Sequence, residues 1–197
     1  MEDPPESDRL VEFLFRIWSG FYDQPIFQRP FYRRVHAAVL RCLGPEGPRL
    51  IVDVGCGTAQ LTADLASHYP AAKVVGVDLS DAMLAAGTRR MDGHAPFLAR
   101  ASVYALPFAD GSVDLVTSTI SYHWYLEPRR ALRELRRVLH PGGQLILAAL
   151  TTRFLRGVVG RARLATLDDT MADLADSGFH VERYERLRPA VRIFVAR

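Results

Sequence analysis

The pattern between residues 50 and 66 constrains the fold more than any other stretch of the chain. An apolar strand pattern over residues 50–54 leads into the turn sequence GCGTAQ at residues 55–60, and a helical pattern begins at Leu61. Glycine lets the backbone turn sharply and lets a ligand approach closely. The free N–H groups at a helix start can bind an anionic group. We therefore expect a buried strand, a tight turn and a helix, with a ligand bound at the turn.

Two side chains near this turn argue against a dinucleotide. The dinucleotide fingerprint needs a third small residue where Gln60 stands. Asp53, at the tip of the strand, would repel a pyrophosphate and suits a ligand with an ammonium group instead. A nicotinamide oxidoreductase is therefore the weakest interpretation. The structural alternative is a turn that only closes a strand–helix unit and binds nothing.

A second strand–helix unit follows the first. Residues 72–78 form a β-branched pattern that ends in Asp78, and Ser80 stands where it can cap a helix over residues 81–91. An acidic residue at the end of the second strand can accept hydrogen bonds from both hydroxyls of a ribose. The spacing therefore favours a nucleoside ligand.

Three segments carry a family resemblance. DVGCGTA at residues 53–59 resembles motif I of the class I S-adenosylmethionine-dependent methyltransferases, which usually has Gly where Ala59 stands. VDLSDAML at residues 77–84 is similar to the family pattern GvDlSxxML. ELRRVLHPGG at residues 134–143 is similar to E-x-x-R-V-L-K-P-G-G. The resemblance covers residues 49–150 and looks most like the small-molecule enzymes of the ubiquinone and menaquinone biosynthesis group.

The resemblance implies S-adenosylmethionine as the cofactor, S-adenosylhomocysteine as its product, and no metal. Leu79 and Met83 would flank the adenine. Ser102 stands where the family has an aspartate that accepts from the adenine amino group, and Val103 would meet the adenine ring through its N–H. The full set of expected cofactor contacts is Tyr22, Asp53, Gly55, Cys56, Gly57, Asp78, Leu79, Met83, Ser102, Val103 and Thr119.

The acceptor is expected beside an aromatic cluster at residues 121–126, which follows a strand predicted over residues 113–120. His123 is the candidate base, since the unperturbed pKa of histidine is about 6.5. Trp18, Tyr122 and Trp124 would line the acceptor pocket. The alternative is that His123 and the aromatic residues only pack the loop.

The segment 1–48 is predicted to be a helical lid beside a cofactor-binding domain at residues 49–197, within a single domain overall. Helices are expected over residues 8–18 and 30–43. In the quinone-type relatives a Tyr-Asp pair lies near the cofactor, and Tyr22-Asp23 matches that pair. The aromatic residues of this segment fit a lid, packing on the edge of the sheet, or an interfacial helix.

These patterns together predict a doubly wound, Rossmann-like α/β fold with helices on both faces. The seven-stranded sheet is expected to be mostly parallel, with an antiparallel C-terminal hairpin over residues 179–187 and 190–196. A helix over residues 129–139 should place its arginines on a solvated face. Pro141 and the two following glycines are expected to end that helix before a strand over residues 144–150.

Composition limits the remaining classes. The chain has 197 residues, a formal net charge of +3 and two cysteines. It is long enough for one core, and its charge is too small to argue for nucleic acid. We expect no disulfide framework, signal peptide or stable membrane insertion, and hence a cytoplasmic monomer or homodimer.

The sequence therefore predicts transfer of a methyl group from S-adenosylmethionine to a small acceptor that is aromatic or apolar. Ser102 keeps a second interpretation open, in which an enzyme of this fold binds the cofactor but catalyses a non-methylating reaction such as a cyclisation or isomerisation. A third is a non-catalytic binding protein on the same fold.

Overall fold

The computed structural model describes residues 28–45, 47–90, 96–151, 165–188 and 190–197. The helix expected over residues 8–18, the residues Trp18 and Tyr22, and most of the connection after the fifth strand lie outside this part of the chain. The division into a lid at residues 1–48 and a domain at residues 49–197 therefore stays a prediction.

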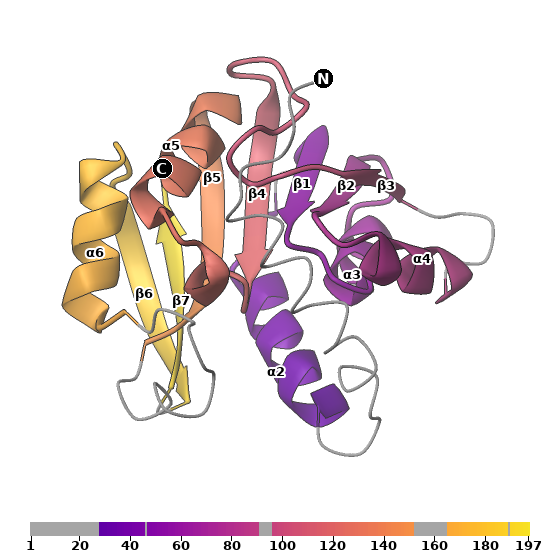
Figure 1. The fold of residues 1–197 in the computed structure, drawn as a ribbon, viewed down its shortest axis with the longest axis horizontal. Helices are drawn as coiled ribbons and strands as arrows, with labels where there is room; N and C mark the ends of the chain where they lie inside the picture. The colour runs from indigo at the N-terminus through magenta and orange to yellow at the C-terminus, as the bar shows by residue number, and fades with distance from the viewer. Residues whose placement is uncertain (1–27, 46, 91–95, 152–164, 189) are drawn as a thin grey trace.

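Seven strands form one sheet in the order β3-β2-β1-β4-β5-β7-β6 (Figure 1). All neighbours from β3 to β5 are parallel, and β7 pairs antiparallel with both β5 and β6. This topology confirms the predicted fold. The strands are β1 Leu50–Val54, β2 Lys73–Asp78, β3 Phe97–Arg100, β4 Val113–Thr119, β5 Leu139–Leu150, β6 Val181–Arg188 and β7 Val191–Ala196.

Helices cover both faces of the sheet, as expected. Because strand side chains alternate between faces, Val52 and Val54 of β1 pack in one cluster with α5 and α6, whereas Ile51 packs in the other with α2 and α3. The order of strands reverses between β1 and β4, which is where open α/β sheets bind ligands. The helices are α2 Gln28–Arg41, α3 Gln60–His68, α4 Asp81–Arg90, α5 Pro128–Val138 and α6 Leu167–Asp176, with the 3-10 helix η1 Tyr122–Trp124.

The junction between α5 and β5 differs from the prediction. The helix ends at Val138, and Leu139 already has extended geometry and pairs with Val113 of β4. The register with β4 then shifts, and the next pair joins Leu115 to Gln144. Pro141 and the glycines therefore form an irregular stretch inside β5 and do not end the helix.

The C-terminal part agrees with the sequence patterns. A capping box starts α6, in which the Thr166 hydroxyl accepts from the N–H of Asp169 and the Asp169 carboxylate accepts from the N–H of Thr166. Gly178, with φ +84°, follows the helix, and the N–H of Phe179 donates to Leu174 O at 3.0 Å. Both cysteines, Cys42 and Cys56, are free thiols. None of the described helices is long and apolar enough to cross a membrane.

Candidate cofactor and acceptor site

The turn after β1 is fastened to the end of β2 by backbone hydrogen bonds. The N–H groups of Gly55 and Cys56 both donate to Val77 O, at 2.8 and 3.0 Å. The N–H of Gly57 donates to Asp78 Oδ2 at 2.8 Å. Gly55 and Gly57 have φ values of +70° and +55°, in the left-handed region that glycine adopts without steric cost. The two strand ends thus form one continuous rim.

The two glycines serve different purposes. A Cβ on Gly55 would lie 2.7 Å from Ser121 Cβ, so glycine is needed there for the turn to pack on the segment after β4. A Cβ on Gly57 would meet no atom within 4 Å. Gly57 therefore borders open space, and a ligand can approach the backbone closely at this position.

Asp53 is buried beneath the turn. Its side chain is 1% exposed, and its two oxygens accept from Thr62 Oγ1 at 2.7 Å and from Thr117 Oγ1 at 2.8 Å. Burial raises the pKa of this carboxyl, and the two hydroxyl hydrogen bonds partly oppose that rise. Any contact with a ligand ammonium group would have to use the remaining lone pairs of a carboxylate that is already hydrogen-bonded.

Asp78 closes the rim from the end of β2. Its Oδ1 accepts from the N–H of Ser80 at 2.9 Å, while Oδ2 holds Gly57. Burial raises the pKa of Asp78, and the hydrogen bonds from backbone N–H groups oppose the rise. Because each carboxylate oxygen has a second lone pair, Asp78 can still accept from two ribose hydroxyls.

The residues expected around an adenine follow the carboxyl ends of β2 and β3. Leu79 is half-buried and Met83 is buried, and the N–H of Met83 donates to Ser80 Oγ at 3.4 Å, so Ser80 caps α4 as predicted. Ser102 and Val103 are half-buried in the segment after β3. Ser102 Oγ accepts from the N–H of Tyr104 at 3.3 Å, which leaves its O–H and a second lone pair for a ligand.

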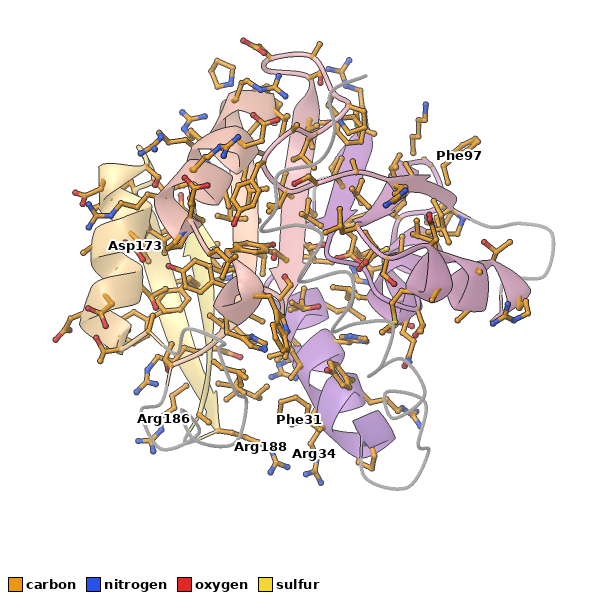
Figure 2. All side chains as sticks on the ribbon, viewed as in Figure 1. Phe31, Arg34, Phe97, Asp173, Arg186 and Arg188 are labelled. Carbon is orange, nitrogen blue, oxygen red and sulfur yellow. The ribbon has the colours of Figure 1, made fainter. Side chains whose placement is uncertain are left out.

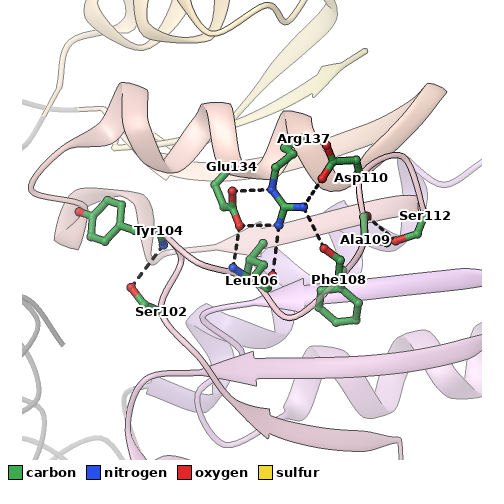
Figure 3. Close-up of polar contacts among 9 residues, drawn as sticks. All are labelled: Ser102, Tyr104, Leu106, Phe108, Ala109, Asp110, Ser112, Glu134 and Arg137. Atoms are coloured by element: carbon green, nitrogen blue, oxygen red, sulfur yellow. Dashed lines mark hydrogen bonds and ion pairs between the residues drawn. The ribbon is translucent and has the colours of Figure 1, made fainter. Parts of the chain in front are cut away.

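A side-chain clamp from α5 holds the chain just beyond Ser102 and Val103 (Figure 3). Arg137 donates from Nη2 to Glu134 Oε1 at 2.7 Å and from Nη1 to Phe108 O at 2.9 Å. Glu134 Oε1 accepts from the N–H of Leu106 at 2.7 Å. The hydrogen bond from Arg137 lowers the pKa of Glu134. The E-x-x-R motif therefore positions the loop on which the expected adenine contacts lie.

The prediction that the arginines of α5 lie largely on a solvated face holds for Arg129, Arg130 and Arg133, which are exposed, but Arg137 is an exception. The Arg137 side chain is 33% exposed and also pairs with Asp110 at 2.6 Å, and Arg129 pairs with the buried Asp173 at 2.8 Å. The arginines of α5 have different partners because different parts of the chain pack beside them. Arg137 contacts the loop after β3, and Arg129 contacts α6.

The segment after β4 leaves the strand through a strained residue. Ile120 has φ +53°, a region that β-branched side chains rarely adopt, and it is buried. Its N–H donates to Ala148 O of β5 at 2.8 Å. Strained backbone of this kind persists only when its surroundings hold it, and it is found preferentially at functional sites. Thr119, just before it, is half-buried and pairs with Ala148.

His123 lies in η1 and is buried without a partner at one nitrogen. Its side chain is 4% exposed, and no group in the described part of the chain hydrogen-bonds to Nδ1. Burial lowers the pKa of His123 to about 4. The imidazole is therefore neutral near pH 7. Its ring centroid is 5.0 Å from that of Trp124, which is half-buried.

Tyr122 does not wall a pocket as predicted. It is 2% exposed, and its hydroxyl donates to Asp173 Oδ2 of α6 at 2.7 Å. Asp173 Oδ1 accepts from Arg129 Nε at 2.8 Å. Tyr122 therefore anchors the segment after β4 to α6 from inside the core.

Comparison with known proteins identifies the domain that this geometry belongs to. Residues 52–147 match the family described as a methyltransferase domain. A malonyl-[acyl-carrier protein] O-methyltransferase of Hahella chejuensis is 41% identical over 114 residues, which cover 57% of this chain and 41% of that protein. A demethylmenaquinone methyltransferase of Thermus thermophilus is 38% identical over 105 residues, covering 52% of this chain and 47% of that protein. Residues 52–147 therefore belong to a methyltransferase domain, and the surrounding chain has the fold of the class I S-adenosylmethionine-dependent methyltransferases.

Solved structures share the fold of this methyltransferase domain at low identity. The magnesium protoporphyrin IX methyltransferase of Synechocystis PCC 6803 with bound S-adenosylhomocysteine superposes with a TM-score of 0.78 at 22% identity, covering 97% of this chain and 99% of that one. The [4+2]-cyclase SpnF superposes with a TM-score of 0.83 at 18% identity, covering 98% and 97%. In contrast, the matched region spans less than half the length of the two curated relatives named above.

The methyltransferase domain also contains a hydroxyl cluster that sequence reasoning missed. Ser118 Oγ lies 2.7 Å from Ser121 Oγ and 2.9 Å from Tyr125 OH, and the latter two atoms are 3.1 Å apart. Burial raises the pKa of Tyr125 to about 12. The three hydroxyl residues occur within eight positions at the end of a central strand. That spacing is the sequence signal from which the cluster could have been predicted.

The methyltransferase domain thus brings most of the expected residues to one edge of the sheet. The rim of β1 and β2 collects Asp53, Gly55, Gly57 and Asp78. Cys56 lies in the same turn as a half-buried thiol whose pKa burial raises. Within the described residues, no group of three or more His, Cys, Asp or Glu side chains could hold a metal ion.

Proposed function

We propose that this domain binds S-adenosylmethionine along the β1–β2 rim and transfers its methyl group to a small acceptor beside the segment after β4. The observation that carries the proposal is the rim itself. The Gly57 N–H is held by the Asp78 carboxylate, and open space lies beside Gly57. The curated relatives, all methyltransferases by name, support the same reaction.

Each part of the rim has a role in this proposal. Asp78 accepts from the ribose hydroxyls, Leu79 and Met83 pack on the adenine, and Ser102 and Val103 meet its edge. Asp53, which lies beneath the turn, attracts the ammonium group of the cofactor. Gly55, Cys56 and Thr119 complete the rim, and Tyr22 remains a proposed contact outside the described residues. When bound, the cofactor supplies a methyl group already activated on a sulfonium.

The protein's own task is to orient the acceptor and exclude water. His123 is neutral and buried, and its Nδ1 has no hydrogen-bond partner among the described residues, so it can accept a hydrogen bond from the O–H or N–H of an acceptor that reaches it. A base is most effective when its pKa lies near the working pH. Because burial lowers the pKa of His123 to about 4, we assign it the role of orienting the acceptor through this hydrogen bond. Trp124 beside it suits an aromatic or apolar acceptor, with Trp18 as a further proposed wall.

Calorimetric titration with S-adenosylhomocysteine tests the cofactor assignment. We expect Asp78→Ala to weaken binding at least tenfold, because it removes two hydrogen bonds to the ribose, each contributing about 1 kcal/mol. Asp81→Ala is the matched control, since among the described residues Asp81 has an ion pair with Arg100 at 3.4 Å and its side chain is 69% exposed. Equal affinity in the wild type and Asp78→Ala would contradict the proposal.

A second variant guards against misfolding of Asp78→Ala. Gly57→Ala places a methyl group in the open space beside the turn without meeting any protein atom within 4 Å. We expect it to fold, as circular dichroism will show, and to bind S-adenosylhomocysteine at least tenfold more weakly than the wild type. Unchanged affinity would place the ligand elsewhere.

A non-methylating reaction on the same cofactor is the second candidate. Ser102 in place of the family's aspartate favours it, as does the high similarity in fold to a [4+2]-cyclase. Mass spectrometry of reactions with a panel of acceptors separates the two. Methyl transfer forms one S-adenosylhomocysteine for each acceptor consumed, whereas a cyclase or isomerase converts its substrate and leaves the cofactor intact.

A further inference from the structure

Two arginines lie directly opposite one another on the β6–β7 hairpin, near the carboxyl edge of the sheet. Arg186 of β6 is the direct partner of Arg192 of β7 in the antiparallel register. Directly opposed residues project to the same side of the sheet, with Cβ atoms about 4.5–5.5 Å apart, and like charges in this position destabilise the pair. The hairpin therefore places two like-charged side chains next to one another on the same side of the sheet.

No carboxylate neutralises this pair within the described residues. Other arginines of the domain do have such partners, for example Arg129 with Asp173 and Arg137 with Glu134. The described contact of Arg192 is a hydrogen bond from Nη1 to the uncharged Thr151 Oγ1. Arg186 is exposed. An uncompensated pair of this kind is a binding position for an anion.

The pair lies on the same edge of the sheet as the acceptor segment. Leu150, at the carboxyl end of β5, pairs with Val191, so the hairpin turn is at the carboxyl edge. Arg192 pairs with Ala149, which packs in the cluster that contains Tyr122 and Tyr125. Neighbouring strands are about 4.8 Å apart, so β7 and β6 lie about 10 and 14 Å from β4. Thr151 directly follows β5, the strand that lies between β4 and β7.

Two further arginines, Arg34 and Arg188, add positive potential from the opposite face of the sheet. Arg188 pairs with Val191, whose side chain packs in the cluster with α2. Arg41 of α2 contacts Glu185 of β6 at 3.6 Å. Arg34 lies two helical turns before Arg41, about 10 Å along α2. Arg188 lies three residues after Glu185, about 10 Å along β6. Figure 2 shows Arg34, Arg186 and Arg188 at the same end of the molecule.

We propose that Arg186 and Arg192, with the Thr151 hydroxyl, bind an anionic group at the far end of the methyl acceptor. This inference rests on the proposed methyl transfer beside β4. The acceptor would be apolar at the end that reaches His123 and would carry a carboxylate or phosphate about 10–14 Å away. Guanidinium groups match both anions with paired hydrogen bonds. A bound anion would also relieve the repulsion between the two arginines.

Phenylhexanoate and its methyl ester are suitable probes, because they share an apolar ring and chain and differ in the charge and in one methyl group. We expect the protein saturated with S-adenosylhomocysteine to bind the carboxylate at least tenfold more tightly than the ester in calorimetric titrations. Arg186→Gln and Arg192→Gln should each remove most of that preference. Arg133→Gln, an exposed arginine on α5 that changes the net charge equally, should retain it.

The outcomes separate this inference from the proposed function. Equal binding of acid and ester, or an equal loss in Arg133→Gln, overturns the anion site while leaving cofactor binding untouched. Failure of S-adenosylhomocysteine to bind overturns the proposed function instead. Competition between phenylhexanoate and S-adenosylhomocysteine would place the anion in the cofactor site and would also overturn the inference.

Thermal unfolding at low salt distinguishes a binding role from a structural one. If the pair awaits an anion, Arg186→Gln removes a repulsion and should raise the unfolding midpoint of the free protein. Inorganic pyrophosphate should then raise the midpoint of the wild type by more than that of Arg186→Gln. A lower midpoint in Arg186→Gln, with no pyrophosphate effect on the wild type, would make Arg186 a structural residue and refute the proposal.

Discussion

The turn after β1 and the segment after β4 end neighbouring strands at the same edge of the sheet, yet they reach unusual backbone conformations in opposite ways. The turn places glycines at Gly55 and Gly57, where φ is positive. The segment after β4 places Ile120 in that same region. The turn adopts its shape mainly through these two glycines, although Ala59 (φ +58°) also lies in this region, whereas the segment places a β-branched residue there.

The difference lies in what stabilises each region. The turn is held by backbone N–H groups bonded to Val77 and Asp78. The segment after β4 depends on side-chain contacts, chiefly the hydroxyl cluster and the bond from Tyr122 to Asp173. A strained residue costs on the order of 1–3 kcal/mol, which such contacts must offset. We infer that the cofactor side is a preformed rim and that the acceptor side is adjustable.

The largest expected effect is at Gly55, where the two regions touch. Gly55→Ala combines the left-handed conformation, about 1–2 kcal/mol, with a clash against Ser121 that costs about 1–3 kcal/mol. We expect the free energy of unfolding from urea titration to fall by about 3 kcal/mol. Gly57→Ala, which has the conformational cost alone, should lose only about 1 kcal/mol. Equal losses would show that the regions are not in tight contact.

The next effect is a pH dependence that arises from His123. Its pKa is about 4 in the folded protein and about 6.5 when unfolded, so the unfolded chain binds the proton more readily between these values. Stability should therefore decrease as the pH falls from 6.5 to 4, by on the order of 3 kcal/mol. Unfolding titrations of His123→Leu should lack this decrease.

The control for this measurement is His180→Gln, because His180 is exposed. It should keep the full pH dependence of the wild type. If the free energies of unfolding of His123→Leu and His180→Gln depend on pH in the same way, the imidazole of His123 is not buried in the way described. The contrast between the two regions then weakens.

The smallest expected effect tests the anchor of the segment after β4. Tyr122→Phe removes one hydrogen bond to the buried Asp173 and should lower the free energy of unfolding by about 2 kcal/mol. Cofactor affinity should change little, because the hydroxyl that is removed bonds to Asp173 of α6. Tyr184→Phe, on an exposed side chain of β6, should leave stability within about 0.5 kcal/mol of the wild type. A loss of cofactor affinity in Tyr122→Phe would show that the two regions are coupled.

The sequence was sufficient for the fold and for much of the rim, because both follow from local patterns. Gly55 and Gly57 sit between an apolar strand and a helix, and Asp78 ends the next strand, so one strand–helix unit predicts each position. The mostly parallel seven-stranded sheet and its antiparallel C-terminal hairpin were predicted correctly for the same reason.

The sequence was insufficient where a distant partner decides the conformation. Leu139 joins β5 because it pairs with Val113, and this made the predicted end of α5 wrong. Tyr122 is buried because its hydroxyl meets Asp173, 51 positions further along the chain. Arg137 is bound to the loop after β3, although its spacing alone suggested a solvated face. None of these partners is visible in a local pattern.

The clamp formed by Glu134 and Arg137 has a consequence for how such a domain can diversify. Three of its bonds end on main-chain atoms, namely the N–H and O of Leu106 and the O of Phe108. Mutations in that loop can replace side chains without releasing the path of the chain. The surface beside a bound nucleoside is therefore open to evolutionary or engineered variation while its scaffold stays in place.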